Sequence, residues 1–396
     1  MPTSAGRVSD RISLLKPTAV NSVLAEVRSL QGQGRQLVSL MRGEPDFQTP
    51  EHITEAALRA LRSGRTTYPD NRGEPALREA VAEKLCRDNG LSYDAVSEIL
   101  ITDGATMGIY AALMTLLGPS DDILVPDPIY DAYQSPIRLA GATARPVRSS
   151  RDGGRFHLTI EALEAGCTPN TRALLLNTPW NPVGTVLTRS ELTEIAEFVC
   201  RHDLMLISDE IYEWITYDGH AHVSPAAVSA EMRQRCVVVN SLSKTYAMTG
   251  WRLGYCAAPP EIIRSMLLVL QQSSRGPAMF VQDAGATALT GPQDCVREMR
   301  DVYAERRCLV TDALSGRQAV QVMAPDGGFF AMVDISRSGR ASDEVRRYLL
   351  NDYGVVVVHG SAYGEAAEGT LRVSFGSGGE TLSRGLQLLR EGLAAL

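Results

Sequence analysis

The sequence predicts an α/β protein with a large domain built on a mainly parallel, doubly covered sheet and a smaller α+β domain. Short apolar runs alternate with helical patterns through the middle of the chain, which favours parallel strands joined by helical crossovers. After about residue 290 this alternation becomes less regular. We therefore predict an N-terminal arm and part of the small domain at 1–45, a large domain at 46–290 and a small C-terminal domain at 291–396.

The predicted strands of the large domain are short, apolar and bounded by Gly, Pro, Asn or Asp, which is typical of buried strands. They lie at 99–102, 123–125, 173–176, 204–207, 237–239 and 253–257. Between the third and the fourth, Thr188 begins a helix with a T-x-x-E capping box that ends at Glu191. Its apolar face continues through Leu192, Ile195 and Val199.

The small domain is predicted from a mixed pattern after residue 290. We expect helices at 293–315, at 342–353 and from about Glu380, with strands at 320–322, 328–333, 355–358 and 371–374. A helical segment at 19–32 is expected to fold back onto this domain.

The composition excludes several classes of protein. The 39 basic and 46 acidic residues give a formal charge of −7, which argues against general nucleic-acid binding because such proteins usually carry a basic face. No run reaches ~18 uninterrupted apolar residues, so we expect no membrane-spanning helix. Residues 1–16 lack the apolar core of a secretory signal. The seven cysteines include no C-x-x-C pair, so no metal site or disulfide framework is predicted and a reducing cytoplasm fits best.

Only three of the 39 basic residues are lysines, so a reaction that needs a lysine amine has few candidates. Lys16 lies in the N-terminal arm, and Lys84 is predicted to lie on a polar helix face at 79–88. Lys244 follows the predicted strand 237–239. Because ligands of open parallel sheets bind beyond the carboxyl ends of the strands, Lys244 is placed to form a Schiff base with a carbonyl cofactor. Its own segment leaves open the alternative of a surface lysine in a loop.

Residues suited to a ligand also lie next to other predicted strands. Arg252 lies eight residues after Lys244 and directly before the predicted strand 253–257, so it can return to the same strand-end crevice. It suits a phosphate dianion, because a guanidinium can bind phosphate in bidentate fashion. The turn Asp103-Gly104-Ala105-Thr106 begins an apolar helix, whose free N–H groups can form a phosphate site, although many such turns bind nothing. Asn181 lies in a segment made rigid by prolines, so its side chain can be aimed at small entropic cost.

Asp209 comes directly after the predicted strand 204–207. A buried carboxylate is costly unless it is paired, and a protonated ring nitrogen would be a suitable partner. Tyr212, three residues later, would point its hydroxyl into the same space. This segment alone leaves open the alternative of a helix N-cap aspartate beside a packing tyrosine.

Together these segments resemble the class I aminotransferases of fold type I, the aspartate-aminotransferase-like group of enzymes that depend on pyridoxal 5′-phosphate (PLP). The resemblance runs from about residue 12 to the C-terminus and implies the PLP-dependent transferase fold with a seven-stranded large sheet. The matching motifs are Gly43-Glu44-Pro45-Asp46-Phe47, Tyr68-Pro69, Asn181-Pro182-Val183-Gly184, Ser208-Asp209-Glu210-Ile211-Tyr212, Ser241-Leu242-Ser243-Lys244, the segment 248–254 and Leu371-Arg372-Val373-Ser374.

The resemblance implies a role for each matching residue. Lys244 would hold PLP as a Schiff base and move the substrate proton, Asp209 would pair with the pyridinium nitrogen, and Tyr212 would bond the ring O3′. The other implied cofactor contacts are Asn181 at O3′, Tyr130 stacked on the ring, Gly104, Ala105, Thr106, Ser241, Ser243 and Arg252 at the phosphate, and Tyr68 at the phosphate of a neighbouring subunit in a homodimer. Arg372, with Asn181 and Gly43, would bind the α-carboxylate of the substrate.

Several residues near the predicted site depart from the family pattern. Trp180 stands where asparagine is usual and is predicted to border the substrate pocket. Arg42 and Arg275 stand where small or uncharged residues are common, which suggests a distal anionic group on the substrate; two solvated arginines are the alternative. Thr106 and Val20 stand where acidic-substrate members carry lysine and threonine, which argues against simple aspartate specificity.

The leading hypothesis is an aminotransferase that moves an amino group from an L-amino acid to a 2-oxo acid by a ping-pong mechanism. A second hypothesis keeps PLP but assigns elimination, replacement, cyclisation or carbon–carbon bond formation on a larger anionic substrate in a specialised pathway. A third is a PLP-binding regulator or scaffold protein, against which the presence of both Lys244 and Asp209 argues.

Overall fold

The computed structural model describes residues 9–13, 15–316 and 320–396. Its largest sheet has seven strands in the order β2-β10-β9-β8-β7-β3-β4. All neighbouring pairs are parallel except the two that β10 makes with β2 and β9. The strands are β2 (Ile99–Thr102), β3 (Asp122–Asp127), β4 (Thr143–Arg148), β7 (Thr171–Asn177), β8 (Met205–Asp209), β9 (Cys236–Ser241) and β10 (Gly254–Ala257). The predicted fold class is confirmed, and β4 is the one strand of this sheet that the sequence did not predict.

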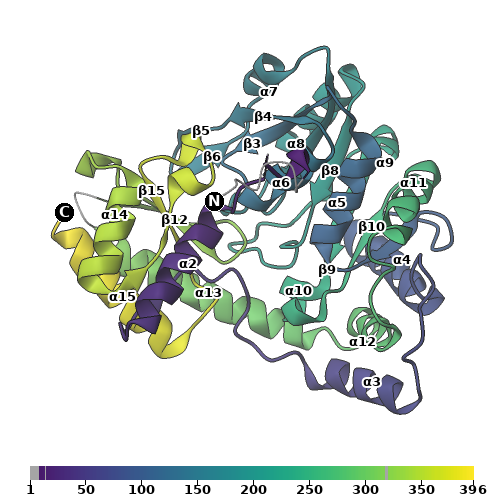
Figure 1. The fold of residues 1–396 in the computed structure, drawn as a ribbon, viewed down its shortest axis with the longest axis horizontal. Coiled ribbons are helices and arrows are strands. Elements are labelled where there is room, and N and C mark those ends of the chain that lie inside the picture. The colour runs from purple at the N-terminus through teal and green to yellow at the C-terminus, as the bar shows by residue number, and fades with distance from the viewer. Residues whose placement is uncertain (1–8, 14, 317–319) are drawn as a thin grey trace, which may run out of the picture.

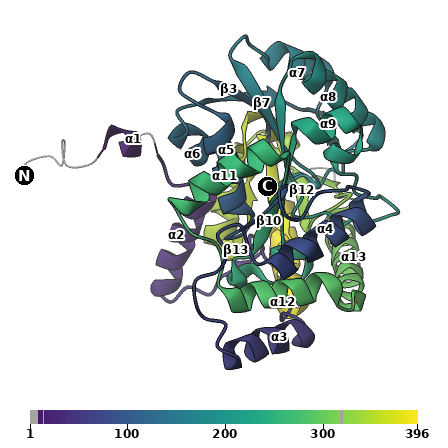
Figure 2. The ribbon, with the colours of Figure 1, turned by 90° about the vertical axis from the view of Figure 1, so that its right-hand side faces the viewer.

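Helices cover both faces of this sheet, as Figures 1 and 2 show. Strand residues alternate between the faces: Leu100 belongs to the buried cluster that includes residues of α5, α6 and α11, whereas Ile99 and Ile101 belong to the cluster that includes residues of α4, α8 and α12. The first group is α5 (Ala105–Leu116), α6 (Gln134–Leu139) and α11 (Pro260–Gln271), and the second is α4 (Pro75–Asn89), α8 (Arg189–Arg201) and α12 (Met279–Thr290). The capping box predicted at Thr188 and Glu191 is confirmed at the start of α8.

The prediction that Lys84 lies on a polar helix face is wrong. The Lys84 side chain is only 2% exposed and points from α4 into the protein. Helix α4 is packed against both β2 and α12, so less of its surface reaches water than its charged residues suggest.

A second, antiparallel sheet of four strands lies beside the first (Figure 1). Its order is β11-β12-β15-β14, and it packs with α13 and α15 around Val333, Phe329 and Leu382. The elements are α13 (Asp294–Leu314), β11 (Gln321–Met323), β12 (Phe330–Asp334), α14 (Ser342–Tyr348) continued by a π-helical turn (Leu349–Tyr353), β14 (Val358–His359), β15 (Thr370–Ser374) and α15 (Gly379–Ala394).

The N-terminal segment lies against this C-terminal part of the chain. Helix α2 (Ala19–Gly32) has the predicted bounds, and its Val23 and Val27 pack against Leu350 and Val356. Strand β1 (Val38–Ser39) pairs in parallel with β13 (Val355–Val356). The remaining elements, apart from single-turn 3₁₀ helices, are α1 (Asp10–Ser13), α3 (Glu51–Arg62), β5 (Ser150–Asp152), β6 (Arg155–His157), α7 (Ile160–Gly166), α9 (Ala230–Arg235) and α10 (Leu242–Thr245).

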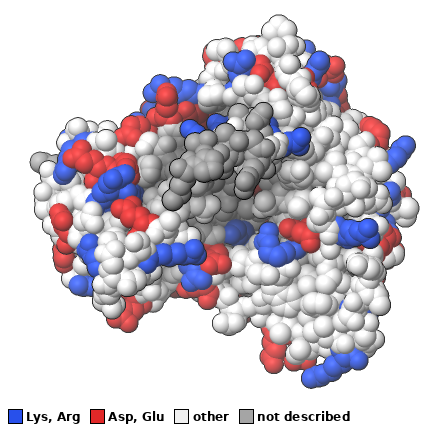
Figure 3. All heavy atoms as spheres, in the orientation of Figure 1, with Lys and Arg blue, Asp and Glu red and all other residues white. Residues whose placement is uncertain are grey.

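Among the described helices, none has the length and apolar content needed to cross a membrane. Basic and acidic side chains are interspersed over the face drawn in Figure 3, without a large patch of one sign.

Candidate active site

A cavity of about 560 Å³ lies at the carboxyl ends of β7, β8 and β9, where the strand order predicted a ligand site. Its wall is completed by α2, by the segment 41–44 and by residues of β12 and β15. Most of the predicted site residues line it: Gly43, Ala105, Thr106, Tyr130, Asn181, Asp209, Tyr212, Ser241, Ser243, Lys244, Arg252 and Arg372. Five predicted site residues do not line the cavity: Arg42, Tyr68, Gly104, Trp180 and Arg275.

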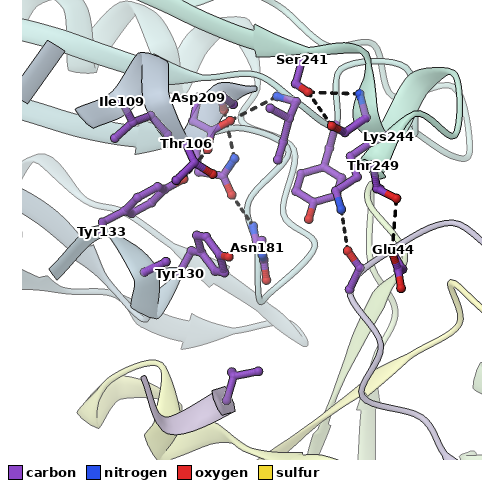
Figure 4. Close-up of a pocket in the computed structure, with 18 of the residues that line it drawn as sticks. Glu44, Thr106, Ile109, Tyr130, Tyr133, Asn181, Asp209, Ser241, Lys244 and Thr249 are labelled. Carbon is purple, nitrogen blue, oxygen red and sulfur yellow. Dashed lines mark hydrogen bonds between the residues drawn. The ribbon is translucent and has the colours of Figure 1, made fainter. Parts of the chain in front are cut away.

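Lys244 projects into the cavity from the short helix α10 (Figure 4). Its ammonium donates a hydrogen bond to the carbonyl of Gly43 and lies 5.7 Å from the centre of the Phe329 ring. Burial lowers the pKa of Lys244 to about 8, although the nearby Glu44 carboxylate opposes this change. A larger fraction of this amine is therefore unprotonated near neutral pH than for an ordinary lysine.

Asp209 ends β8 and is 2% exposed. Its carboxylate accepts hydrogen bonds from the Tyr133 hydroxyl and from the Ile211 N–H at 3.3 Å, but forms no ion pair with a described residue. Burial raises its pKa to about 6. No helix begins here, so the N-cap alternative is wrong. A buried carboxylate that faces a cavity and has no ion-pair partner among the described residues fits a cationic ring nitrogen.

The other side of the cavity is suited to an anion. Helix α5 begins after Gly104, and the N–H groups of Ala105 and Thr106, in its first turn, have no partner within the helix. The Arg252 guanidinium lies close to this turn, since a Cβ at residue 104 would be 2.6 Å from its Nη2. Gly104 has a φ of +79°, a backbone conformation that favours glycine. Ser241 and Ser243 complete the group, with 2.8 Å between their hydroxyl oxygens.

Arg372 is a buried cation that faces the same cavity and is 3% exposed. Its guanidinium donates to the Met41 carbonyl at 2.9 Å and to Asn181 Oδ1 at 3.3 Å. It lies between the rings of Phe330 (4.2 Å) and Tyr363 (4.9 Å), and its Nε has no hydrogen-bond partner in the described part of the chain. A carboxylate would satisfy both this donor and the buried charge.

The turn after β7 is held by hydrogen bonds to its neighbours. The Asn177 side chain accepts the Asn181 N–H at 2.8 Å and donates to the Asp209 carbonyl at 3.0 Å. Trp180 donates from Nε1 to the Pro128 carbonyl at 2.9 Å and is buried outside the cavity lining. Trp180 therefore packs two strand-end segments together and does not border the cavity.

Arg42 and Arg275, the two arginines that depart from the family pattern, lie outside the cavity lining. Arg42 is paired with Glu44 at 2.5 Å, and Glu44 lines the cavity. The Arg275 guanidinium lies 5.8 Å from the centre of the Tyr68 ring, and Tyr68 is 85% exposed.

Sequence reasoning missed several residues of the site. Tyr133 was not singled out, although it lies three residues after Tyr130 in a turn that follows β3. Phe330 and Tyr363 enclose Arg372, but in the sequence they appear as ordinary aromatic residues of the small domain. Only the spacing from Tyr130 gave a usable signal, and only for Tyr133.

Known proteins are similar to this chain over most or nearly all of its length, in sequence and in fold. An aromatic-amino-acid aminotransferase of Thermococcus litoralis is 39% identical, covering 97% of each chain. An arginine–pyruvate transaminase of Pseudomonas aeruginosa is 38% identical, covering 88% of each. The structure of the Thermus thermophilus aspartate aminotransferase with maleate superposes with a TM-score of 0.91 at 36% identity, covering 97% of this chain and 99% of that one.

The fold and the cavity together define a PLP-dependent transferase of fold type I. The chain belongs to the aminotransferase class I and II family, whose model matches residues 35–388.

Proposed function

We propose that this aminotransferase uses PLP, held by the residues of the cavity, to move an amino group from an L-amino acid to a 2-oxo acid. The observation that carries the proposal is the convergence of Asp209, Lys244 and Arg372 on one cavity. They supply a buried carboxylate with no ion-pair partner, an amine of lowered pKa and a buried guanidinium whose Nε has no hydrogen-bond partner, all among the described residues. The aminotransferase names of the relatives support the same reaction.

Each wall of the cavity would bind one part of the cofactor. Asp209 would pair with the ring nitrogen, Lys244 would hold the cofactor through Nζ, and Tyr130 would stack on the ring. Tyr212 and Asn181 would bond the ring oxygen, and the phosphate would be bound by Ala105, Thr106, Ser241, Ser243 and Arg252. When bound, PLP supplies an electron sink that stabilises negative charge at the substrate Cα.

The chain's own residues would orient the substrate and move its proton. Arg372 would bind the α-carboxylate, which fixes the direction of the Cα–H bond relative to Lys244. The Lys244 amine, with its pKa near 8, can accept a proton at Cα, and its flexible stem lets it deliver that proton elsewhere. In the described residues, nothing favours elimination, replacement or carbon–carbon bond formation over transamination.

A half-reaction tests this proposal. Purified protein loaded with PLP is mixed with single L-amino acids without a 2-oxo acid, and the visible absorbance of the cofactor is followed. We expect at least one amino acid to convert PLP to pyridoxamine phosphate, and Lys244→Ala to abolish the conversion. Release of ammonia or a condensed product, with no pyridoxamine phosphate from any amino acid, would overturn it.

We also propose that an arginine recognises a distal anionic group of the substrate. Neither Arg275 nor Arg42 lines the cavity of this chain, and we favour Arg275 because its charge is not already paired within the described residues. Glu44 already holds Arg42, whereas Arg275 has no carboxylate partner in the described part of the chain. We expect Arg275→Ala to lower kcat/KM for dicarboxylic donors at least tenfold and to leave aromatic donors within twofold. Equal changes for both donor classes would contradict it, and Arg42→Ala is the matched comparison.

A homodimer in a reducing cytoplasm completes the proposal. The exposed Tyr68 would contribute to the phosphate site of a second subunit, as the family resemblance implies. All seven cysteines are free, which supports a reducing compartment.

A further inference from the structure

Behind the cavity, on the side of the sheet covered by α4, lies a buried lysine that the proposed reaction does not use. The Lys84 ammonium donates to Asn89 Oδ1 at 2.8 Å and forms an ion pair with Glu213. The side chains of Lys84 and Glu213 are 2% and 6% exposed. Asn89 Nδ2 also donates to Glu213 at 3.0 Å, so the charged pair is enclosed by polar partners.

This group of side chains reaches two residues of the cavity through the backbone. Glu213 directly follows Tyr212, and its Oε1 accepts a second hydrogen bond from Asn240 at 2.8 Å. Asn240 Oδ1 accepts the N–H of Ser241 at 2.7 Å. Ser241 is the N-cap residue of α10, the helix that carries Lys244.

The side chains of β9 alternate between the two faces of the sheet, which explains how contacts on the α4 side can affect residues of the cavity. Val237 and Val239 pack with α5, whereas Val238 packs on the α4 side. Asn240 therefore faces α4, and Ser241 faces the cavity and α5. The hydrogen bond from Asn240 to Glu213 therefore also restrains the end of β9, where Ser241 lies and α10 starts.

Net stability gives little reason to bury such a pair. The cost of taking two charges out of water largely offsets their attraction, and apolar residues often replace a buried ion pair without loss. The neighbouring Glu210 does not need Lys84, because Ser208, Ser224 and His222 already bond its carboxylate. What the pair does supply is a fixed geometry among α4, the turn after β8 and the end of β9.

We propose that Lys84 is a positioning residue, which through Glu213 and Asn240 fixes Tyr212 and the start of α10 against the bound cofactor. The inference rests on the proposed PLP site. Its consequence is that uncharged replacements of the pair weaken cofactor binding more than their effect on folding explains.

The test measures the dissociation constant of PLP by fluorescence titration of cofactor-free protein, well below its melting temperature. Wild type is titrated first, and no binding there would contradict the proposed function itself. We expect Lys84→Met/Glu213→Gln, which removes both charges, to weaken PLP binding at least tenfold. The KM for the amino donor should stay within threefold, because Arg372 lies on the other side of the cavity.

Arg346→Met is the matched control, because Arg346 is also a buried cation, 3% exposed and paired with Glu26 and Asp343, but lies in α14 away from the cavity. Its PLP affinity should stay within twofold of wild type. Asn240→Ala keeps the ion pair and removes the link to Ser241, so it should weaken PLP binding about fivefold even if the double variant does not fold. Unchanged PLP affinity in Asn240→Ala, or an equal loss in Arg346→Met, would overturn the inference.

Discussion

At the scale of single residues, the Asp209 carboxylate is buried and has no ion-pair partner among the described residues, so its ionisation opposes folding of the cofactor-free protein. Its pKa is about 6 when folded, against an ordinary value of 3.8. Between pH 4 and 6 the unfolded chain ionises first, so the free energy of unfolding falls as pH rises and stays lower above pH 6. The two pKa values differ by about two, which corresponds to about 3 kcal/mol. Thermal unfolding of cofactor-free protein across this range measures the effect.

Other carboxylates have lowered pKa values and produce the opposite slope, for example Glu213 and Glu191. The informative quantity is therefore the difference between wild type and Asp209→Asn, whose amide oxygen can still accept the Tyr133 hydrogen bond. We expect the variant to be the more stable at pH 7, with an advantage that disappears towards pH 4. A difference that does not change with pH would contradict the assigned pKa.

The sequence allowed some site residues to be predicted because their signal is local. Asp209 and Lys244 lie at or just beyond the carboxyl ends of apolar runs, and parallel strands bring such ends to one edge. Arg252 lies just before β10, whose antiparallel direction brings its start to the same edge. Lys84 had no such signal. A lysine among charged residues of a helix indicates an exposed face, and only the packing of α4 against α12 reverses that expectation.

At the scale of elements, the capping box of α8 gives a prediction that separates stability from function. Thr188 Oγ1 accepts the Glu191 N–H at 3.2 Å, and Glu191 accepts the Thr188 N–H at 2.7 Å. Thr188→Ala should destabilise the protein by about 1 kcal/mol, because an amphipathic helix packed on the sheet loses its N-terminal cap. PLP affinity should not change, since neither residue lines the cavity. Thermal unfolding and PLP titration measure the two effects.

Thr193→Ala is the control on the same helix. Its exposed hydroxyl donates to the Arg189 carbonyl four residues earlier, an interaction that adds little to helix stability. We expect a change below about 0.5 kcal/mol. Equal losses in the two variants would show that the capping box makes no special contribution.

The strands of the large sheet were predictable where the side chains on both faces of the strand are buried. All six predicted strands of the large sheet occur, because each reads as a continuous apolar run. Strand β4 was missed because it carries Arg145, Pro146 and Arg148, which an edge strand paired only with β3 tolerates; the other edge strand, β2, is an almost wholly apolar run and was predicted. Its position in the sheet comes from pairing with β3, which residue type alone does not encode.

At the scale of the whole molecule, the substrate end of the cavity depends on contacts between distant parts of the chain. Arg372 meets Asn181 across 191 positions and bonds the carbonyl of Met41 across 331. No local pattern predicts such a meeting, and only the resemblance to a known family placed Arg372 in the site. The residues proposed to bind the cofactor lie at the ends of neighbouring strands, so predicting them needed less information about contacts between distant parts of the chain.

The proposed homodimer leads to a prediction about sharing of sites between subunits. If Tyr68 serves the partner, a mixed dimer of Lys244→Ala and Tyr68→Ala subunits contains one complete site, with Lys244 from one chain and Tyr68 from the other. Random association makes about half of the dimers mixed, so activity should recover to about a quarter of wild type. The measurement is turnover after mixing, at a PLP concentration too low to load the Tyr68→Ala dimer.

A second mixture separates shared sites from simple rescue by subunit exchange. Lys244 and Asp209 line the same cavity of one chain, so mixing Lys244→Ala with Asp209→Ala subunits leaves no complete site and should restore nothing. Differently tagged subunits show that mixed dimers have formed in both experiments. If mixed dimers of the first pair form without recovery, Tyr68 does not complete the partner's site, and its 85% exposure then requires another explanation.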